Sequence, residues 1–243
     1  MSREPEPKPP ENPSAAPLTP LSEFEGSLAN RVYHSLKTAI MSLAYRPGEV
    51  LRKRDVCAAL GVSRSPVSEA VARLASEGLV KVVPQAGTYV ACFSMAEIRE
   101  GAFLREALEQ AAVEHLAGTV TDEQIARLRR NLRFQEIHIE DGDTAGFYEM
   151  DTELHRMLLG FTGYRRLAQL AETSWVHVNR ARQLILPEPG RIEATLREHR
   201  EIVDALEARD GERARQAIRH HLRQLLRHLE PLEQAHPEWF TSE

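Results

Sequence analysis

Four side chains in the C-terminal half have types and spacings that suit a divalent metal site. Asp151 and His155 are four residues apart, so they project from the same face of a helix. His199 and His221 each lie in the apolar stripe of a separate helical segment, whereas the neighbouring His220 lies among polar residues. Buried polar groups need partners, and one divalent cation would satisfy all four. Three nitrogens and one oxygen suit zinc, nickel or another late first-row metal.

The spacing alone leaves a second interpretation open, because a histidine in a protein core is usually just hydrogen-bonded to a neighbour. We expect no ligand role for the histidines that stand alone in the sequence: His34, His138, His177 and His236. Cys57 and Cys92 lie far apart and form no CxxC motif, which excludes a disulfide scaffold or a cysteine-built zinc site.

A second group of residues, in the N-terminal half, suits contact with nucleic acid. Ser63, Arg64 and Ser65 stand at the start of a helical segment. Arginine can pair with guanine O6 and N7 or with a phosphate, and hydroxyls and free helix N–H groups suit phosphate oxygens. Three further basic residues precede them: Arg52, Lys53 and Arg54. A basic cluster can also be no more than a solvated surface, so the surrounding elements decide between the two interpretations.

The elements that must position these basic residues begin with three helices. Apolar residues at helical spacing predict a first helix over 28–43 and a second over 53–60, where Gly61 takes the usual C-terminal glycine position. Ser63 is the N-cap candidate of a third helix, with Pro66 in its first turn.

A hairpin follows the third helix. The β-prone runs 79–83 and 88–90 flank a turn that has Gly87 at its tip. Three helices and a hairpin in this order predict a winged helix-turn-helix domain, whose third helix enters the major groove while the hairpin reaches the adjacent backbone or minor groove.

The C-terminal half has no comparable strand pattern and predicts an all-α helical bundle. Capping residues, glycines and prolines mark the ends of about six helices: 94–116, 121–139, 143–160, 164–185, 191–208 and 211–229. The four candidate metal ligands fall on three of them. The expected fold is therefore mainly α, with an N-terminal winged helix-turn-helix and a C-terminal all-α bundle.

Composition bounds the size and the location of the protein. With 243 residues, of which 42% are hydrophobic, the chain can bury one or two modest cores, which excludes a large multidomain enzyme. No stretch approaches the roughly 18 uncharged apolar residues of a membrane span, and the N-terminus is polar and proline-rich. We expect a cytoplasmic protein with no membrane partner.

The net charge of −5 divides unevenly along the chain. Residues 1–20 hold seven of the fourteen prolines and predict a disordered tail. Residues 21–93, the expected DNA-binding domain, carry nine Lys and Arg against six Asp and Glu, whereas everything after residue 93 carries twenty against twenty-seven. The expected effector-binding and metal-binding domain spans 94–230, and 231–243 form a C-terminal tail. A basic block thus precedes an acidic one, which is a signal of separate domains.

The motif LGVSRSPVSEAVARL spans residues 60–74, and EGLV and Gly87 follow it. Over about residues 28–92 this pattern resembles the GntR family of bacterial transcription regulators. The resemblance implies an operator-base contact by Arg64, further DNA contacts nearby and a wing tip shaped by Gly87. The implied neighbouring contacts are Arg54, Ser63 and Ser65. Ser68 stands where the family commonly has arginine, so the contact of that arginine is absent here.

The acidic half resembles the FCD ligand-binding domain of the FadR subfamily over about residues 97–226. The recognisable pieces include Arg105 with Leu108-Glu109, Asp151-x-x-x-His155, Glu198-His199 and His221-Leu222. The resemblance implies that the metal ligands are those of metal-containing members: Asp151, His155, His199 and His221. It also implies a small carboxylate effector that completes the coordination of the metal.

Arginine is the natural partner of a carboxylate effector. Arg105 is the first candidate, although a structural ion pair with Glu109 is an alternative. Arg180 and Arg182, on another helix, are weaker candidates for the same role.

We therefore expect a ligand-responsive transcription regulator that is not an enzyme. Repression is the commoner behaviour in the family, and a homodimer would place two recognition helices on a palindromic operator. Two alternatives remain open: a metal-dependent hydrolase or lyase that carries a DNA-binding module, and a regulator whose metal is purely structural.

Overall fold

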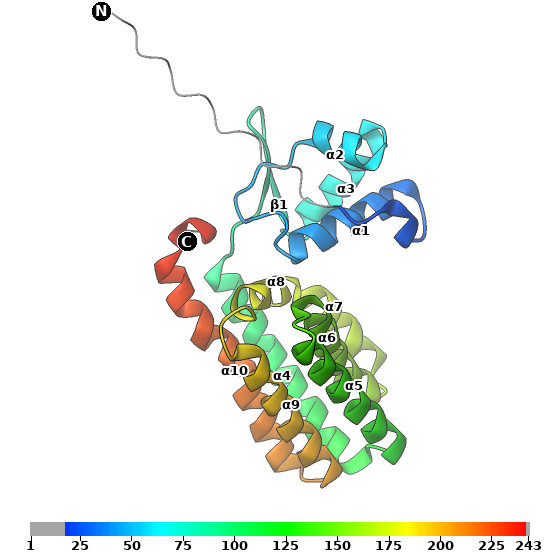
Figure 1. Ribbon diagram of the computed structural model, residues 1–243, viewed down its shortest axis with the longest axis vertical. Coiled ribbons are helices and arrows are strands. Elements are labelled where there is room, and N and C mark those ends of the chain that lie inside the picture. The colour runs from blue at the N-terminus through cyan, green and yellow to red at the C-terminus, as the bar shows by residue number, and fades with distance from the viewer. Residues whose placement is uncertain (1–17, 242–243) are drawn as a thin grey trace, which may run out of the picture. The chain divides into compact units, whose positions relative to one another are not determined.

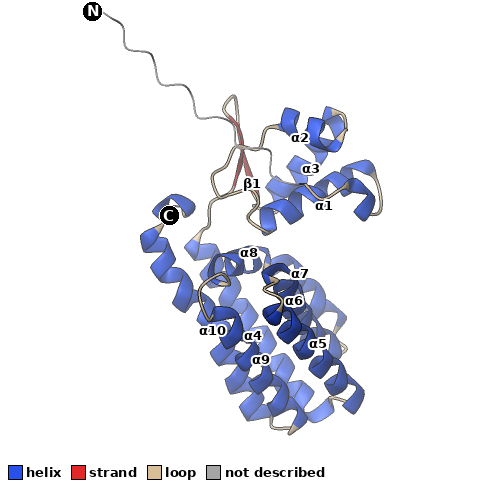
Figure 2. Cartoon of the chain, in the orientation of Figure 1, coloured by secondary structure: helices blue, strands red, loops and turns tan. Residues whose placement is uncertain are grey.

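The computed structural model describes residues 18–241 and divides the chain into two compact units, Met1–Ala91 and Cys92–Glu243 (Figure 1). The division falls two residues before the boundary expected after Phe93. The predicted tail, residues 1–20, lies almost wholly outside the described residues. Helices dominate the described part of the chain, and its sheet has two strands (Figure 2). The mainly α fold class is confirmed.

The N-terminal unit contains three helices and a hairpin. Its elements are a 3-10 turn (Leu21–Glu23), α1 (Leu28–Met41), α2 (Lys53–Leu60), α3 (Arg64–Ser76), β1 (Val80–Val83) and β2 (Gly87–Val90). The two strands are antiparallel, with Val80 opposite Val90 and Val83 opposite Gly87. This confirms the predicted winged helix-turn-helix.

Local sequence explains how α2 and α3 are joined. Gly61 ends α2 in the left-handed region, with φ at 65°, which glycine adopts without steric cost. Ser63 follows in an extended conformation as the N-cap of α3. Leu36 of α1 and Val71 and Leu74 of α3 are buried in the core of this unit, whereas the start of α3 and the outer face of this helix are exposed.

The C-terminal unit is an all-α bundle. Its helices are α4 (Met95–Thr119), α5 (Asp122–Glu140), α6 (Thr144–Phe161), α7 (Arg165–Ser174), α8 (Val176–Ile185), α9 (Arg191–Glu207) and α10 (Gly211–Ala235). The long helices α4 and α10 pack side by side, and α5 packs against both α6 and α9 (Figure 1). Fully buried aliphatic residues fill the centre: Leu116, Leu128, Leu154, Leu158, Ile202, Leu206 and Ile218.

Side-chain caps fix where several of these helices begin. Ser94 accepts a hydrogen bond from the Glu97 amide at the start of α4. Thr121 and Gln124 form a reciprocal capping box at the start of α5. Both helix starts were predicted by the capping patterns in the sequence.

The single helix expected over 164–185 is wrong. The chain forms α7 and α8 instead, separated at Trp175, whose backbone leaves the helical region with φ at −106° and ψ at 11°. The Trp175 side chain is buried, and the Arg105 guanidinium lies 5.1 Å from its ring centre. The break thus places a large ring in the interior, and the bundle has seven helices in its described part instead of six.

Part of the C-terminal tail expected from residue 231 is helical. Helix α10 continues through Pro231 to Ala235, and a 3-10 turn follows at Pro237–Trp239. Phe240 is buried with its ring 5.7 Å from that of Phe93. The apolar contact of Phe240 explains why the chain stays attached to the bundle beyond the end of α10.

Packing of α6 positions two of the candidate ligands. Leu158 is fully buried, so Leu158→Ala leaves a cavity and is expected to lower the free energy of unfolding of the bundle by about 2–5 kcal/mol. Urea unfolding followed by circular dichroism measures the change. Ile137→Ala, at a position 45% exposed on α5, is the matched control and is expected to cost less than about 1 kcal/mol. Equal losses in the two variants would contradict this account of the core.

Candidate metal and effector site

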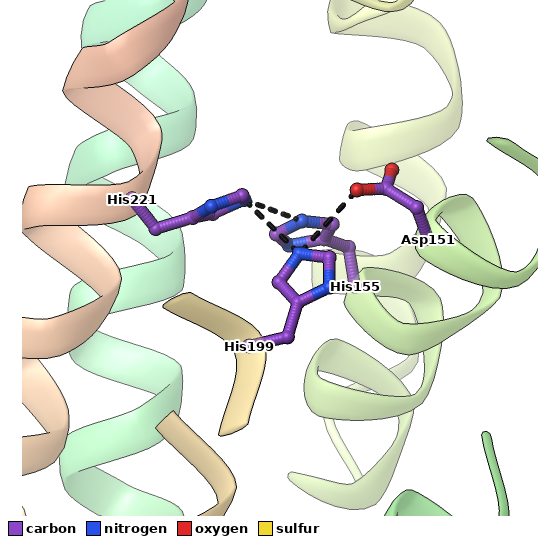
Figure 3. A group of neighbouring side chains, drawn as sticks. All are labelled: Asp151, His155, His199 and His221. Atoms are coloured by element: carbon purple, nitrogen blue, oxygen red, sulfur yellow. Dashed lines mark hydrogen bonds and ion pairs between the residues drawn. The ribbon is translucent and has the colours of Figure 1, made fainter. Parts of the chain in front are cut away.

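Three helices bring the four predicted metal ligands together inside the bundle. Asp151 and His155 project from α6, His199 from α9 and His221 from α10 (Figure 3). All four side chains are buried, and one candidate ligand atom of each lies within 4.8 Å of the others. The convergence expected from the sequence pattern is therefore present in the structure.

The imidazole Nε2 atoms face one another. His221 Nε2 lies 3.1 Å from His155 Nε2 and 3.3 Å from His199 Nε2. Asp151 Oδ1 lies 3.3 Å from His199 Nε2. These are the contacts drawn between the labelled residues in Figure 3.

Each ring is held from behind through its other nitrogen. His155 Nδ1 lies 2.6 Å from Glu109 Oε2, and His221 Nδ1 lies 2.7 Å from Glu198 Oε2. His199 Nδ1 lies 2.8 Å from Gln135 Oε1. Ionised carboxylates and the amide oxygen only accept hydrogen bonds, so each Nδ1 carries the donating proton and each Nε2 presents a lone pair to the centre.

The groups that hold the rings are themselves held. Arg105 donates to Glu109 over 2.6 Å, which establishes the ion pair that the sequence left as an alternative. Arg191 donates two hydrogen bonds to Glu198, of 2.8 and 2.6 Å. Gln135 donates to Asn131 over 2.7 Å, which leaves its carbonyl oxygen for His199. The orientation of every ring is thus set by two successive layers of hydrogen bonds.

Burial keeps the three imidazoles neutral. It is the main cause that lowers the pKa of His155, lowers that of His221 to about 4 and lowers that of His199 well below its ordinary value. The neighbouring Glu109 and Glu198 oppose the effect of burial on His155 and His221 without overcoming it. Neutral imidazole is the form that binds a metal.

The carboxylates that accept hydrogen bonds from the histidines, Glu109 and Glu198, are ionised because their neighbours outweigh the effect of burial. Burial alone would raise the pKa of Glu109, but His155 and Arg105 outweigh it and lower the pKa to about 2. Burial of Glu198 is likewise outweighed by His221 and Arg191, and its pKa also falls to about 2. Both groups can therefore accept hydrogen bonds at neutral pH.

The four ligands fit a late first-row metal ion. An ion about 2.0–2.1 Å from each imidazole nitrogen would keep two such nitrogens about 2.9–3.4 Å apart, for ligand angles between about 90° and 109°. The observed separations of 3.1 and 3.3 Å fall in this range. Nitrogen lone pairs at these distances repel one another unless a proton or a cation lies between them. The residues present could thus hold a metal ion.

A cavity of about 30 Å³ adjoins two of the four candidate ligands. Asp151 and His221 line one part of it, and three guanidinium groups line another: Arg105, Arg182 and Arg191. Its apolar lining includes Val178, Ile185 and Leu225. Arg182 forms an ion pair with Asp151 and, because of its burial, has a pKa lowered to about 9.

Two of the three arginines predicted for the effector thus reach this cavity. Arg180 does not line it; its guanidinium carbon lies 4.5 Å from the ring centre of Phe93 instead. Arg180 and Arg182 are two residues apart on α8, so they point to different sides of that helix.

Sequence reasoning missed Gln135 and Arg191. Gln135 shares the buried face of α5 with Ile125, Leu128 and Leu132, and a polar residue on an apolar helix face was the available signal. Arg191 is the first residue of α9 and pairs with Glu198, which lies about two turns later on the same face of the helix, and this spacing was the available signal.

The candidate DNA contacts lie on the surface of the N-terminal unit. Ser63, Arg64 and Ser65 are exposed at the first turn of α3. At the start of α2, Arg52 and Arg54 are exposed and Lys53 is half-buried. Gly87 is exposed next to the turn of the hairpin, as the first residue of β2, with φ at 137°. No helix among residues 18–241 is both long and apolar enough to cross a membrane.

Two family models match the chain. Residues 28–90 match the bacterial regulatory proteins of the gntR family, and residues 100–224 match the FCD domain. The HTH-type transcriptional repressor RspR of Escherichia coli K12 is 32% identical over 213 residues, which cover 88% of this chain and 93% of RspR. An uncharacterized HTH-type transcriptional regulator of Streptomyces ambofaciens is 32% identical over 212 residues, or 87% of this chain and 89% of its own.

Solved structures show the same fold. A transcriptional regulator of the GntR type from Rhodococcus sp. RHA1, 27% identical, matches 83% of this chain and 98% of its own with a TM-score of 0.72. Escherichia coli McbR/YncC, 23% identical, matches 86% of this chain and 99% of its own with a TM-score of 0.73, which shows the fold alone. The chain therefore belongs to the GntR family of bacterial transcriptional regulators, with a winged helix-turn-helix domain that binds DNA and an FCD domain that follows it.

Proposed function

We propose that this regulator holds a divalent metal, zinc or nickel, on Asp151, His155, His199 and His221. A small carboxylate bound beside the metal then changes the affinity of the protein for operator DNA. The observation that carries the proposal is the convergence of three Nε2 lone pairs whose rings are fixed at Nδ1. The metal would supply positive charge and open coordination positions for carboxylate oxygens.

The charges around the site favour an anionic ligand. Each carboxylate is paired with one guanidinium group: Asp151 with Arg182, Glu109 with Arg105, and Glu198 with Arg191. These charges cancel, so a divalent cation would add two positive charges that nothing in this set balances. An uncompensated charge in a buried site is costly, and a carboxylate ligand reduces that cost.

The cavity favours a small ligand. Its volume of about 30 Å³ is enough for about two water molecules, so a bound acid of more than a few atoms requires the surrounding side chains to move. Arg105 and Arg182 are the guanidinium groups proposed to meet its carboxylate, and Arg191 is a third in the same lining.

DNA binding is assigned to the exposed start of α3, the basic start of α2 and the wing. Arg64 is proposed to contact operator bases, with Ser63, Ser65, Arg52, Lys53, Arg54 and Gly87 near the backbone. We further propose that the protein works in the cytoplasm as a homodimer, because two recognition helices related by a two-fold axis match a palindromic operator. Repression is the proposed outcome of DNA binding, and the relative RspR is named a repressor.

The arrangement gives little support to a catalytic metal. Glu109 and Glu198 are the carboxylates nearest the histidines, and each already accepts hydrogen bonds from a histidine and an arginine. Neither is poised to act as a general base, which must reach the proton that it removes. A purely structural metal is the remaining rival, and it predicts metal binding without any response to acids.

The metal site predicts one Zn²⁺ bound per chain. Zn²⁺ at a hundredfold excess over its Kd is expected to raise the free energy of unfolding by about 2.7 kcal/mol, because only the folded chain presents the assembled site. Calorimetric titration and thermal unfolding measure both quantities. His199→Ala is expected to lose Zn²⁺ binding and the stabilisation by Zn²⁺. His138→Ala changes a half-buried histidine that pairs with Asp143, and it is expected to keep both properties. Wild-type Zn²⁺ binding by His199→Ala would contradict the assignment.

The anion site predicts a response to small acids. In the Zn²⁺-loaded protein, at least one member of a panel of small mono- and dicarboxylates is expected to shift the operator Kd by about 5–150-fold, the usual size of an allosteric coupling. Fluorescence anisotropy of a labelled operator measures the shift. Arg105→Met is expected to weaken the response because it removes a guanidinium group from the cavity. An operator Kd that no acid changes would favour the structural metal.

Base contact by α3 predicts a specific loss in Arg64→Ala. Operator affinity is expected to fall by about 1–3 kcal/mol, or roughly 5–150-fold, while Zn²⁺ binding stays unchanged. Arg200→Ala, which removes an exposed arginine of the C-terminal unit, is the matched control and is expected to keep operator affinity. Anisotropy with specific and scrambled duplexes separates a base contact from a phosphate contact, since only a base contact distinguishes the two sequences.

A further inference from the structure

The first residues of the C-terminal unit are held by a small group of contacts that neither DNA binding nor metal binding requires. Phe93 is buried, and it donates its N–H to the Trp239 carbonyl over 2.8 Å and accepts from the Thr241 N–H over 2.8 Å. Its ring packs on Phe240 and faces the Arg180 guanidinium, with the guanidinium carbon 4.5 Å from the ring centre. We call Phe93, Arg180, Trp239, Phe240 and Thr241 the Phe93 clasp.

The clasp lies where the two units are joined. Ala91 donates its N–H to the Leu79 carbonyl over 3.0 Å, a hydrogen bond within the N-terminal unit. Phe93, two residues later, is hydrogen-bonded within the C-terminal unit. Only Cys92 separates the two anchored residues. The closed clasp therefore leaves only Cys92 between the hydrogen-bonded residues of the two units, and when the clasp opens, Phe93 also becomes free to change its backbone angles.

Helix α8 connects the clasp to the metal and effector site. Arg180 extends from one side of this ten-residue helix to Phe93. From another side, Arg182 pairs with Asp151, and Val178 and Ile185 line the cavity with it. Both arginines are buried, so neither contact is a loose surface pair. A helix of this length moves as a rigid element. A shift or rotation of α8 that alters the Arg182–Asp151 contact therefore also alters the Arg180–Phe93 contact.

We propose that α8 couples occupancy of the site to closure of the Phe93 clasp, and so controls the freedom of the junction that carries the DNA-binding unit. This inference rests on the proposed function. A carboxylate bound beside the metal competes with Asp151 for the Arg182 guanidinium, which removes one of the two anchors of α8. The ligand thereby favours one of two clasp states, and the difference in its affinity for them sets the size of the effect.

The first experiment needs no ligand. Hydrogen exchange in the metal-free full chain reports on the Phe93 and Thr241 amides, which the clasp protects. Arg182→Gln removes the anchor at Asp151 and is expected to speed exchange at both amides by about tenfold or more, while amides within the core of the N-terminal unit keep their rates. Phe240→Ala removes a ring of the clasp itself, so its exchange rates at the Phe93 and Thr241 amides set the upper limit expected for Arg182→Gln.

Gln183→Ala changes the same helix outside the clasp and the cavity lining, and it is expected to leave both amides protected. If Arg182→Gln does not fold, Arg182→Lys is used in the same experiment, because lysine keeps the positive charge on a shorter side chain. Wild-type exchange rates at Phe93 and Thr241 in a folded Arg182 variant would overturn the coupling, whether or not the protein binds a metal.

The second experiment separates this inference from the proposed function. Arg180→Leu keeps an apolar side chain against Phe93 but removes the guanidinium, so Zn²⁺ is expected to bind it as it binds the wild type. In the wild type, Zn²⁺ alone is expected to change exchange at Phe93 and Thr241, because Asp151 is a ligand of the proposed metal and its pair with Arg182 is weakened when the metal binds. In Arg180→Leu this change is expected to be lost. Equal responses to Zn²⁺ in both proteins would overturn the role of Arg180. Absence of Zn²⁺ binding to the wild type would overturn the proposed metal site, and the metal-free exchange would then decide the coupling by itself.

Discussion

The bundle depends on pairing the carboxylates around its candidate site with guanidinium groups and the imidazoles with hydrogen-bond acceptors. Two buried carboxylates, a third that is 11% exposed, three buried guanidinium groups and three buried imidazoles surround one point, in a medium where an unpaired charge costs several kcal/mol. Each imidazole is therefore bound at Nδ1, and each supporting glutamate is bound by an arginine. The same requirement that orients the rings leaves their Nε2 atoms facing the centre. Stability and ligand geometry thus come from one set of contacts.

This requirement also explains why the arginines come from different helices. Arg105 and Glu109 lie one turn apart on α4, so that pair forms within a helix. Arg182 on α8 reaches Asp151 on α6, and the break at Trp175 is what lets α8 take its own direction toward that carboxylate. Moreover, the Trp175 ring lies under the Arg105 guanidinium. The break therefore belongs to the site as much as to the fold.

The sequence predicted those parts that depend on local chemistry or on one face of one helix. Gly61, the capping patterns at Ser94 and Thr121 and the ligand pair on α6 all follow from spacings of four residues or fewer. The break at Trp175 was missed because the apolar pattern continues across it, and the cost of leaving the helix is met by tertiary burial of the ring. The attachment of Phe240 to Phe93 was missed for a related reason, since it joins residues 147 positions apart. Nothing near either residue signals such a contact.

The division of charge along the chain bears on how such a site can control DNA binding. Residues 21–93 carry a net charge of +3, whereas residues 94–243 carry −7 and are repelled by phosphates. We therefore expect the operator contacts in the winged helix-turn-helix, whereas the proposed metal and effector site lies in the other unit. In the proposed homodimer, the covalent junction and the spacing of the two winged helix-turn-helix domains on DNA are the features through which a signal from the bundle would act. Only Cys92 lies between Ala91 and Phe93, which are each hydrogen-bonded within their own unit, so a change in the backbone at Phe93 acts on a very short junction and is not spread over a long flexible linker.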